Sequence, residues 1–399
     1  MQFTDIIGQD EVKNNLVRLV HQNRLSHALL FLGKEGNGML PLAMAFAQFM
    51  VCEKVNGKSQ TSAGPSLFGN EPEVTREPMH DSCGVCPACT KSHQLIHPDI
   101  HFSYPVVTKK AGSPPLSTDY ITEWREFVSS YPYGNVYDWL QFIGAENKQG
   151  NITANECNDI SRKLSLKSFE SEYKILILWM PEYLGNEGNK LLKLIEEPPE
   201  NTLFLLLAEN ESMILPTILS RCQLIKVPPL ETSEIELALI TRNNTEPTQA
   251  AQVAGVSDGN YRDALQALQH ADEDWQSMFR EWLGTILRLG PIAQTKWVDE
   301  MSKLGREKQK QFLRYCNHLL EQSIRVRVRG EDHQMPEKER DFAIRLNKVS
   351  GLEQQQAMVE EIDKAVYYIE RNANPKILFL ALTIKLYHII QDKIVFLTE

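Results

Sequence analysis

Short, continuous apolar runs alternate with amphipathic segments through the first 228 residues. The runs lie at residues 28–32, 174–179, 203–208 and 224–227. Such runs are typical of strands that are buried on both faces of a parallel sheet. Helical periodicity begins at about Asp10. It recurs in residues 40–49, 152–166, 186–197 and 216–220. The alternation predicts an α/β fold with a doubly wound, mostly parallel sheet.

Beyond Pro228 the strand signals fade and only helical patterns remain. Residues 231–270 predict a small helical unit, and residues 275–399 predict a longer helical one. The last helix, residues 375–391, is apolar enough that we expect burial on more than one side. One of its apolar faces carries Ile377, Leu380, Ala381 and Ile384, and Leu378 and Leu382 widen it. The predicted domains are therefore residues 1–228, 229–272 and 273–399.

The composition excludes several classes of protein. With 42% hydrophobic and 24% charged residues, the chain resembles folded globular proteins and not disordered ones. Its apolar stretches are interrupted by charges, so no membrane span is expected. The N-terminus lacks a basic segment followed by an apolar one, which favours a cytoplasmic protein without a secretion signal. A net charge of −10 argues against a general nucleic-acid coat but allows a local basic patch.

The segment GKEGNG, residues 33–38, follows the first predicted strand and precedes a helix. This is the context of a phosphate-binding loop, whose pattern is GxxxxGK[ST]. Gly33 and Gly38 occupy the glycine positions, with Gly36 between them, but Met39 and Leu40 replace the lysine and the hydroxyl residue. Neither side chain neutralises a triphosphate or ligates Mg²⁺. A simple tight turn would also explain this segment alone.

The second apolar strand carries a matching loss at its end. An active nucleotide site would have acidic residues there to organise Mg²⁺ and water, but Trp179 and Met180 occupy these positions. Two independent losses at complementary places favour a disabled nucleotide site over a tight turn. We therefore expect that this chain does not hydrolyse ATP.

Three of the seven cysteines are packed into seven residues, at Cys83, Cys86 and Cys89. The two interlocking CxxC spacings predict a structural zinc knuckle, which needs a fourth ligand. Cys52, which follows the helix predicted at residues 40–49, is the preferred candidate, while His93 and His97 are alternatives. Free surface thiols and a redox role are less consistent with this spacing.

Ser220, Arg221 and Cys222 follow the third strand and its helix. By residue type alone, Arg221 is best interpreted as a solvated or salt-bridging arginine. A set of longer motifs, however, occurs in order along the chain: FTDIIGQ (3–9), SHALLF (26–31), the cysteine cluster with HPD (97–99), LLKLIEEPP (191–199), SRC (220–222) and GNYRDAL (259–265). Together they resemble the AAA+ clamp-loader subunits of bacterial DNA polymerase III, and NANP at 372–375 resembles the start of their last collar helix.

This resemblance implies an AAA+ P-loop-type domain, a small helical lid and a C-terminal helical collar that holds an oligomer together. The family contains an ATP-hydrolysing gamma/tau type and a non-hydrolysing delta prime type. Met39, Leu40, Trp179 and Met180 depart from the former, which favours the delta prime type. Arg221 would then act in trans as an arginine finger in the ATP site of a neighbour, and Arg262 would be a vestigial sensor arginine.

The implied partners are gamma/tau and delta subunits, a sliding clamp reached through the complex, and the phosphates of primer–template DNA. A gamma/tau-type or other AAA+ ATPase remains the alternative, and a zinc-bearing scaffold without a clamp-loading role is a third hypothesis. Residues 53–82 and 105–150 are longer than the family leads us to expect. The second segment is rich in aromatic residues, so we expect it to form helices that pack locally.

Overall fold

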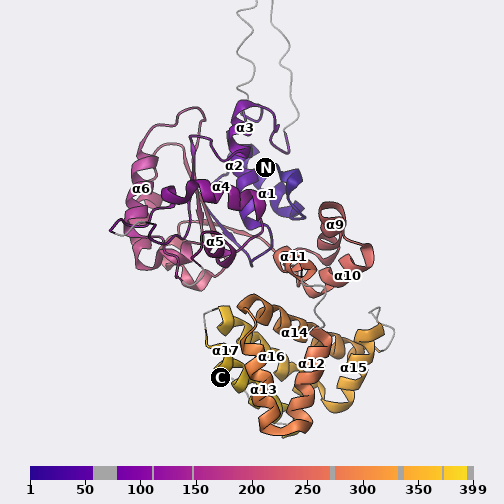
Figure 1. The fold of residues 1–399 in the computed structure, drawn as a ribbon. Coiled ribbons are helices and arrows are strands. Elements are labelled where there is room, and N and C mark those ends of the chain that lie inside the picture. Colours follow the sequence, from indigo (N-terminus) through magenta and orange to yellow (C-terminus); the bar gives the residue numbers. More distant parts are fainter. Residues whose placement is uncertain are drawn as a thin grey trace, which may run out of the picture. The chain divides into compact units, whose positions relative to one another are not determined.

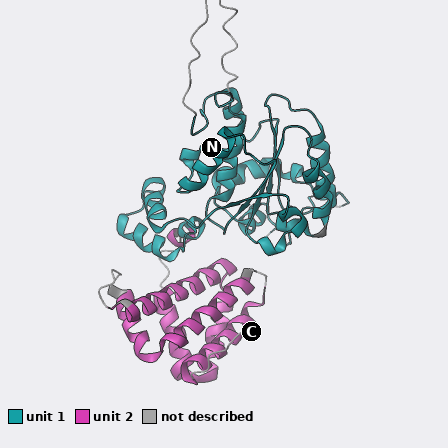
Figure 2. Ribbon diagram, turned by 180° about the vertical axis from the view of Figure 1, so that it is seen from behind, with its two compact units in different colours: residues 1–265 teal, residues 266–399 magenta. Residues whose placement is uncertain are grey.

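The computed structural model describes residues 1–56, 79–109, 112–145, 148–269, 275–330, 337–370 and 373–392. The chain divides into two compact units, residues 1–265 and 266–399 (Figure 2). The segment predicted as a separate lid falls mostly in the first unit, so the division into three domains stays a prediction. Most of the excursion at 53–82 lies outside the described residues. Across the described part of the chain, no helix is long and apolar enough to cross a membrane.

A five-stranded parallel sheet forms the centre of the first unit, with the strand order β2-β3-β4-β1-β5. The strands are β1 (Ala28–Leu32), β2 (Ile100–Ser103), β3 (Lys174–Trp179), β4 (Thr202–Ala208) and β5 (Gln223–Lys226). The α/β class and the parallel sheet are therefore confirmed. Sequence patterns predicted four of these strands and missed β2, which has only four residues and includes His101 and Ser103.

Helices cover both faces of this sheet, which is why its inner strands β1, β3 and β4 are almost entirely apolar (Figure 1). Leu29 and Phe31 pack in one core with side chains of α1 and α2. Their neighbours Ala28 and Leu30 belong to a second core with side chains of α6 and α7. Successive side chains of a strand point to opposite faces, so both faces need apolar residues.

The helices of the first unit match most of the predicted segments. They are α1 (Asp10–His21), α2 (Met39–Val51), α3 (Pro87–His93), α4 (Ile121–Ser130), α5 (Val136–Phe142), α6 (Ala154–Ser165), α7 (Asn189–Glu196), α8 (Pro216–Leu219), α9 (Thr232–Asn243), α10 (Pro247–Val256) and α11 (Tyr261–Gln269). Short 3₁₀ segments are η1 (Phe3–Asp5), η3 (Ser117–Tyr120), η4 (Pro181–Gly188) and η5 (Glu211–Met213). The helix predicted from residue 186 therefore begins three residues later, after η4.

The aromatic segment between β2 and β3 folds into α4 and α5, as expected, and packs locally. The ring of Trp124 stacks on Tyr104 with 3.9 Å between centroids, and it lies 5.3 Å from Trp139. It also lies 5.2 Å from Trp179, the last residue of β3. The aromatic side chain at the end of β3 is thus part of a core that this segment supplies.

The second unit is helical and has a core of its own. It comprises α12 (Trp275–Gly284), the π-helix η6 (Thr285–Leu289), α13 (Gly290–Ser302), α14 (Arg306–Arg329), α15 (Glu337–Val349), α16 (Leu352–Glu370) and α17 (Pro375–Gln391). The indole rings of Trp282 and Trp297 stack at 4.8 Å near the centre of this core.

The bounds predicted for α17 are confirmed, and the face that packs in the core of its own unit differs from the apolar face singled out in the sequence. Phe379, Leu382 and Leu386 point into the core. The face singled out in the sequence is solvent-exposed instead, with 69% of Ile377, 38% of Leu380 and 46% of Ile384 accessible. A helix that is apolar on all sides carries no periodicity that tells its two faces apart.

Candidate functional site

The segment from Gly33 to Gly38 connects β1 to α2 and keeps the backbone of a phosphate loop. Gly36 and Gly38 both have positive φ angles, 72° and 87°, and Gly38 caps α2. These values lie in the left-handed region that glycine adopts without strain. Met39 and Leu40, in contrast, are only 5% and 4% exposed and belong to the core on the α1/α2 face of the sheet. The two substituted positions therefore stabilise the fold and do not face a ligand.

The loop is hydrogen-bonded by side chains of its own unit. Asn37 donates from Nδ2 to the carbonyl of Val227 (2.9 Å) and accepts from the backbone N–H of Met39 (3.1 Å). Gln9 donates to the carbonyls of Asn37 (3.2 Å) and Pro228 (2.7 Å). An amide that would face a phosphate in an active loop is thus already satisfied by Asn37.

Side chains from other segments of the chain lie close to the Cα atoms of two loop glycines. A Cβ atom at Gly36 would lie 1.7 Å from Oδ1 of Asn260, the residue before α11. One at Gly38 would lie 2.9 Å from the ring of Tyr133, whose hydroxyl accepts a hydrogen bond from the N–H of Ile7. The close approach that glycine permits is therefore used here by residues of this chain.

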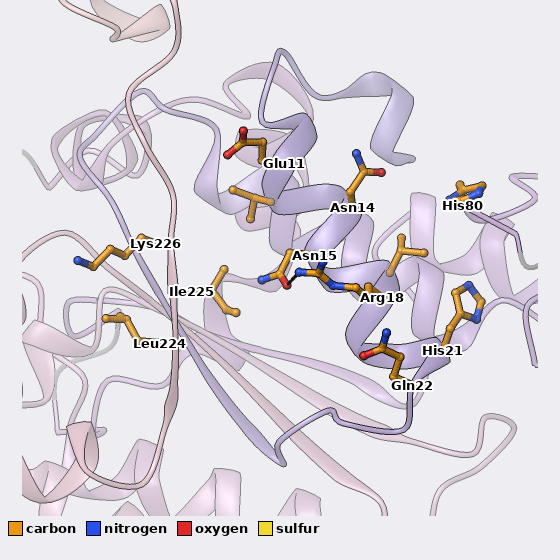
Figure 3. A pocket seen from close by; sticks show the side chains of 12 residues that line it. Glu11, Asn14, Asn15, Arg18, His21, Gln22, His80, Leu224, Ile225 and Lys226 are labelled. Atoms are coloured by element: carbon orange, nitrogen blue, oxygen red, sulfur yellow. Dashed lines mark hydrogen bonds between the residues drawn. The ribbon is translucent and has the colours of Figure 1, made fainter.

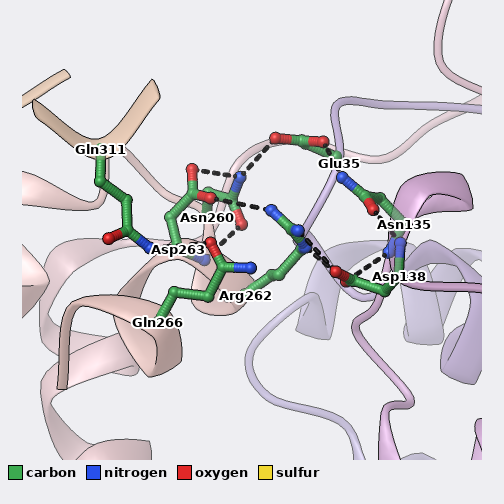
Figure 4. Close-up of polar contacts among 8 residues, drawn as sticks. All are labelled: Glu35, Asn135, Asp138, Asn260, Arg262, Asp263, Gln266 and Gln311. Atoms are coloured by element: carbon green, nitrogen blue, oxygen red, sulfur yellow. Dashed lines mark hydrogen bonds and ion pairs between the residues drawn. The ribbon is translucent and has the colours of Figure 1, made fainter. Parts of the chain in front are cut away.

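A carboxylate of the loop joins three segments of the first unit (Figure 4). Glu35 accepts hydrogen bonds from Nδ2 of Asn135 (2.8 Å), at the start of α5, and from Nδ2 of Asn260 (3.3 Å). A negative charge within the loop also opposes the approach of a triphosphate, because like charges repel.

Arg262, the predicted vestigial sensor, is 4% exposed and bound by carboxylates of the same unit (Figure 4). Its Nε and Nη2 atoms contact the two carboxylate oxygens of Asp138 on α5, at 2.5 and 2.6 Å. Asp263 lies 3.3 Å from Nη1. Such bidentate pairing is among the strongest charge-assisted contacts in proteins. The guanidinium is therefore committed to α5 in this structure.

The end of β3, where an active nucleotide site would carry acidic residues, is also occupied by apolar groups. Trp179 is 2% exposed, and Met180 adopts a positive φ of 60°. Glu182 follows in η4 and accepts hydrogen bonds from the backbone N–H groups of Glu209 (2.6 Å) and Asn210 (2.8 Å), just after β4. Burial raises the pKa of this carboxyl group. Glu182 thus connects the ends of β3 and β4 through backbone amides.

The structure brings the four predicted zinc ligands together. The sulfur atoms of Cys52, Cys83, Cys86 and Cys89 all lie within 4.8 Å of one another, and those of Cys83 and Cys89 are 3.9 Å apart. Tetrahedral zinc with bonds of about 2.3 Å separates its sulfurs by about 3.8 Å, so the arrangement fits this metal. Backbone N–H groups of Cys83 and Cys86 also donate to Cys52 and Cys83 sulfurs.

Two of these thiols share a hydrogen bond that shifts their pKa values in opposite directions. Hydrogen bonding from the Cys89 thiol lowers the pKa of the Cys52 thiol to about 4 and raises that of Cys89. The alternative ligands lie elsewhere among the described residues. His93 contacts the N-terminal amine at 2.9 Å, and Nε2 of His97 is 3.4 Å from Glu170.

Arg221 lies at the surface between α8 and β5 and is 36% exposed. Its Nη2 atom forms an ion pair with Glu196 at 2.6 Å, and Nη1 donates to the carbonyl of Thr217 at 2.7 Å. Its neighbour Cys222 packs against the core on the α6/α7 face, and burial raises the pKa of that thiol to about 11. The guanidinium is thus positioned by α7 and α8 at an accessible place.

The parallel sheet, with a glycine loop between β1 and α2, defines an α/β protein of the P-loop type. The chain belongs to the family described as DNA polymerase III, delta subunit, whose sequence model matches residues 8–231. This membership confirms the resemblance to clamp-loader subunits that the sequence motifs indicated.

Curated relatives include both clamp-loader types. The delta' subunit of Bacillus subtilis is 27% identical over 266 residues, which covers 66% of this chain and 60% of the relative. The tau subunit of the same organism is 24% identical over 276 residues, with 68% and 38% covered. The chain thus spans between about two fifths and three fifths of these relatives' length. A gamma subunit-related protein from Thermotoga maritima matches 94% of this chain and 98% of its own, at 14% identity and a TM-score of 0.37.

Proposed function

We propose that this chain is a non-hydrolysing, delta prime-type subunit of a DNA polymerase III clamp loader. The observation that supports this most directly is the closed phosphate loop. Apolar residues occupy its lysine and hydroxyl positions, Asn37 accepts the hydrogen bond of the Met39 N–H, and Asn260 holds the carboxylate of Glu35. A loop in this state has neither the cation nor the magnesium ligand that phosphoryl transfer needs.

The contribution of Arg221 is then made in a neighbouring subunit. An arginine finger stabilises the charge that develops on the transferred phosphoryl group and is worth roughly 10³–10⁵ in rate in GTPases. Arg221 is accessible, and its partner Glu196 is itself an exposed carboxylate. Exchange of this surface ion pair for a phosphate costs little, because exposed pairs contribute about 0–1 kcal/mol.

The four cysteines hold a structural zinc ion in this proposal. The ion, when bound, cross-links the end of α2 to the start of α3, and a full set of thiolates leaves no open position for catalysis. The partners are gamma/tau and delta subunits, with the sliding clamp and primer–template phosphates contacted through the complex. The protein acts in the cytoplasm.

Two measurements test this function. The isolated chain should show no turnover of Mg·ATP, whereas measurable hydrolysis would favour the gamma/tau-type alternative. In a complex reconstituted with gamma/tau and delta subunits, Arg221→Ala should abolish DNA-stimulated hydrolysis at the one site that this arginine serves and so lower the total rate.

The matched control is Arg162→Ala, since Arg162 is an exposed arginine that also pairs with a carboxylate of its own unit. That variant should leave the rate of the complex unchanged. An unaltered rate with Arg221→Ala would contradict the arginine-finger role and favour the zinc-bearing scaffold.

A further inference from the structure

A groove runs between α1 and β5, and its lining includes no residue of the phosphate loop or of the cysteine cluster (Figure 3). It has a volume of about 910 Å³ and is open to solvent. One wall is the polar face of α1, the other is strand β5, and His80 lies at one end. Neither the sequence motifs nor the proposed function uses this groove.

The β5 wall is a sheet edge with unpaired backbone groups. Within the described residues β5 pairs with β1 alone. The N–H of Val227 donates to Leu32 of β1 at 2.8 Å, so the backbone polar groups of Val227 and Ile225 point toward β1. Because these directions alternate along a strand, Leu224 and Lys226 present their N–H and C=O groups outward. Such an edge is a template for an added strand.

The charges beside this edge are predominantly positive. Arg18 lies on the α1 side, where its Nη2 donates to Oδ1 of Asn15 at 2.9 Å. Lys226 lies on β5, and Figure 3 shows its side chain on the opposite side of the strand from Ile225. Neither cation has an ion pair with a carboxylate in the described part of the chain. Glu11 is the one carboxylate among the described lining residues.

We propose that this groove binds an extended, acidic segment of a partner protein, which pairs with β5 as a sixth strand. The backbone of such a segment would bond to the outward groups of Leu224 and Lys226. Its alternate side chains would point to the two sides of the sheet, where Arg18 and Lys226 can each receive a carboxylate. Consecutive acidic residues are therefore preferred over isolated ones.

A single-stranded nucleic acid fits this groove less well. Proteins that bind such strands without sequence preference stack bases on aromatic side chains and follow the phosphates with several cations. The described lining instead contains the apolar side chains of Val12, Leu224 and Ile225. An added strand also accounts for the unpaired backbone edge, which phosphates do not.

A direct test uses the full chain and a short fluorescein-labelled peptide. In this peptide each valine is followed by two consecutive glutamates. Fluorescence anisotropy should show saturable binding, which a lysine-containing counterpart should lack. Leu224→Pro removes an outward N–H that the sheet itself does not use, so it should weaken binding while the fold persists. Arg18→Glu should weaken it about tenfold or more through the lost charge-assisted contact.

Arg24→Glu is the matched control, because it makes the same change of charge at an exposed residue outside the lining. It should leave the affinity unchanged. Absence of saturable binding, or equal binding by all variants, would overturn the proposal. A labelled single-stranded oligonucleotide that binds with sensitivity to Arg18→Glu but not to Leu224→Pro would also overturn it and identify a phosphate site.

Discussion

At the scale of single residues, Glu35 and Arg262 connect the glycine loop, α5 and α11 through polar contacts. Glu35 is held by Asn135 and Asn260, and Arg262 by Asp138. Burial of an unpaired guanidinium would cost several kcal/mol, whereas a bidentate carboxylate offsets that cost. The pair therefore joins α5 to α11 strongly, although each ion alone would be unfavourable in this place.

Asp138→Asn should lower the free energy of unfolding by up to about 3–5 kcal/mol, because the buried Arg262 loses its bidentate carboxylate and keeps the 3.3 Å contact with Asp263. Urea denaturation of the full chain measures this change. Asp341→Asn is the control, since its ion pair with Arg345 is solvent-exposed and 3.9 Å long. The control should change stability by less than about 1 kcal/mol. Similar effects of both variants would show that the buried pair has no special role.

Sequence reasoning found the glycine and cysteine positions at this scale because their spacing is local. It missed Glu35, Asp138 and Asn260 because they meet only through the fold. One signal was present: Asn135 and Asp138 form a capping box at the start of α5, in which each side chain bonds the other's backbone. This pattern predicts the helix start but not the arginine that Asp138 binds.

At the scale of elements, strands buried on both faces were the most predictable part of the fold. The inner strands β1, β3 and β4 consist almost entirely of buried apolar residues, whereas the edge strands β2 and β5 have four residues each and include polar ones. The adjacent Leu224 and Ile225 still indicated β5, but apolar and polar residues alternate in β2 and give no apolar run. The core face of α17 was not predicted because a helix that is apolar on all sides has no distinguishing periodicity.

The cysteine cluster is a link between elements, and zinc content tests it. We expect one zinc ion per chain, and Cys52→Ser should lower the zinc content measured by atomic emission because one of four converging sulfurs is lost. The same variant should unfold at a lower temperature, since a structural metal stabilises the folded state that binds it. Cys222→Ser changes a cysteine outside the cluster and should retain full zinc. Full zinc in Cys52→Ser would instead indicate a histidine as the fourth ligand.

At the scale of the whole molecule, the second unit combines a complete core with an apolar outer stripe. The stripe consists of Ile377, Leu380, Ile384 and Tyr387 on α17, all exposed, while Phe379 and Leu386 fill the core beneath. Contiguous exposed apolar residues of this kind mark interaction surfaces. The stripe fits the collar role that we propose for this region.

Ile384→Glu should therefore prevent copurification with gamma/tau and delta subunits, because it places a charge in the proposed collar interface. The isolated chain should keep its circular dichroism spectrum, since the side chain contributes little to the core. Leu237→Glu on α9 is the control, because that leucine is 63% exposed and lies outside the collar. Normal assembly of Ile384→Glu would place the interface elsewhere on the molecule.

The closure of the phosphate loop has one more consequence. A nucleotide stabilises the protein that binds it in proportion to the logarithm of its concentration over the dissociation constant. The contacts of Glu35 and Arg262 join groups of one polypeptide. Their contribution to stability therefore does not depend on the concentration of a ligand. Under the proposed function, the conformation of the first unit should therefore be the same in starved and in growing cells, although their ATP concentrations differ.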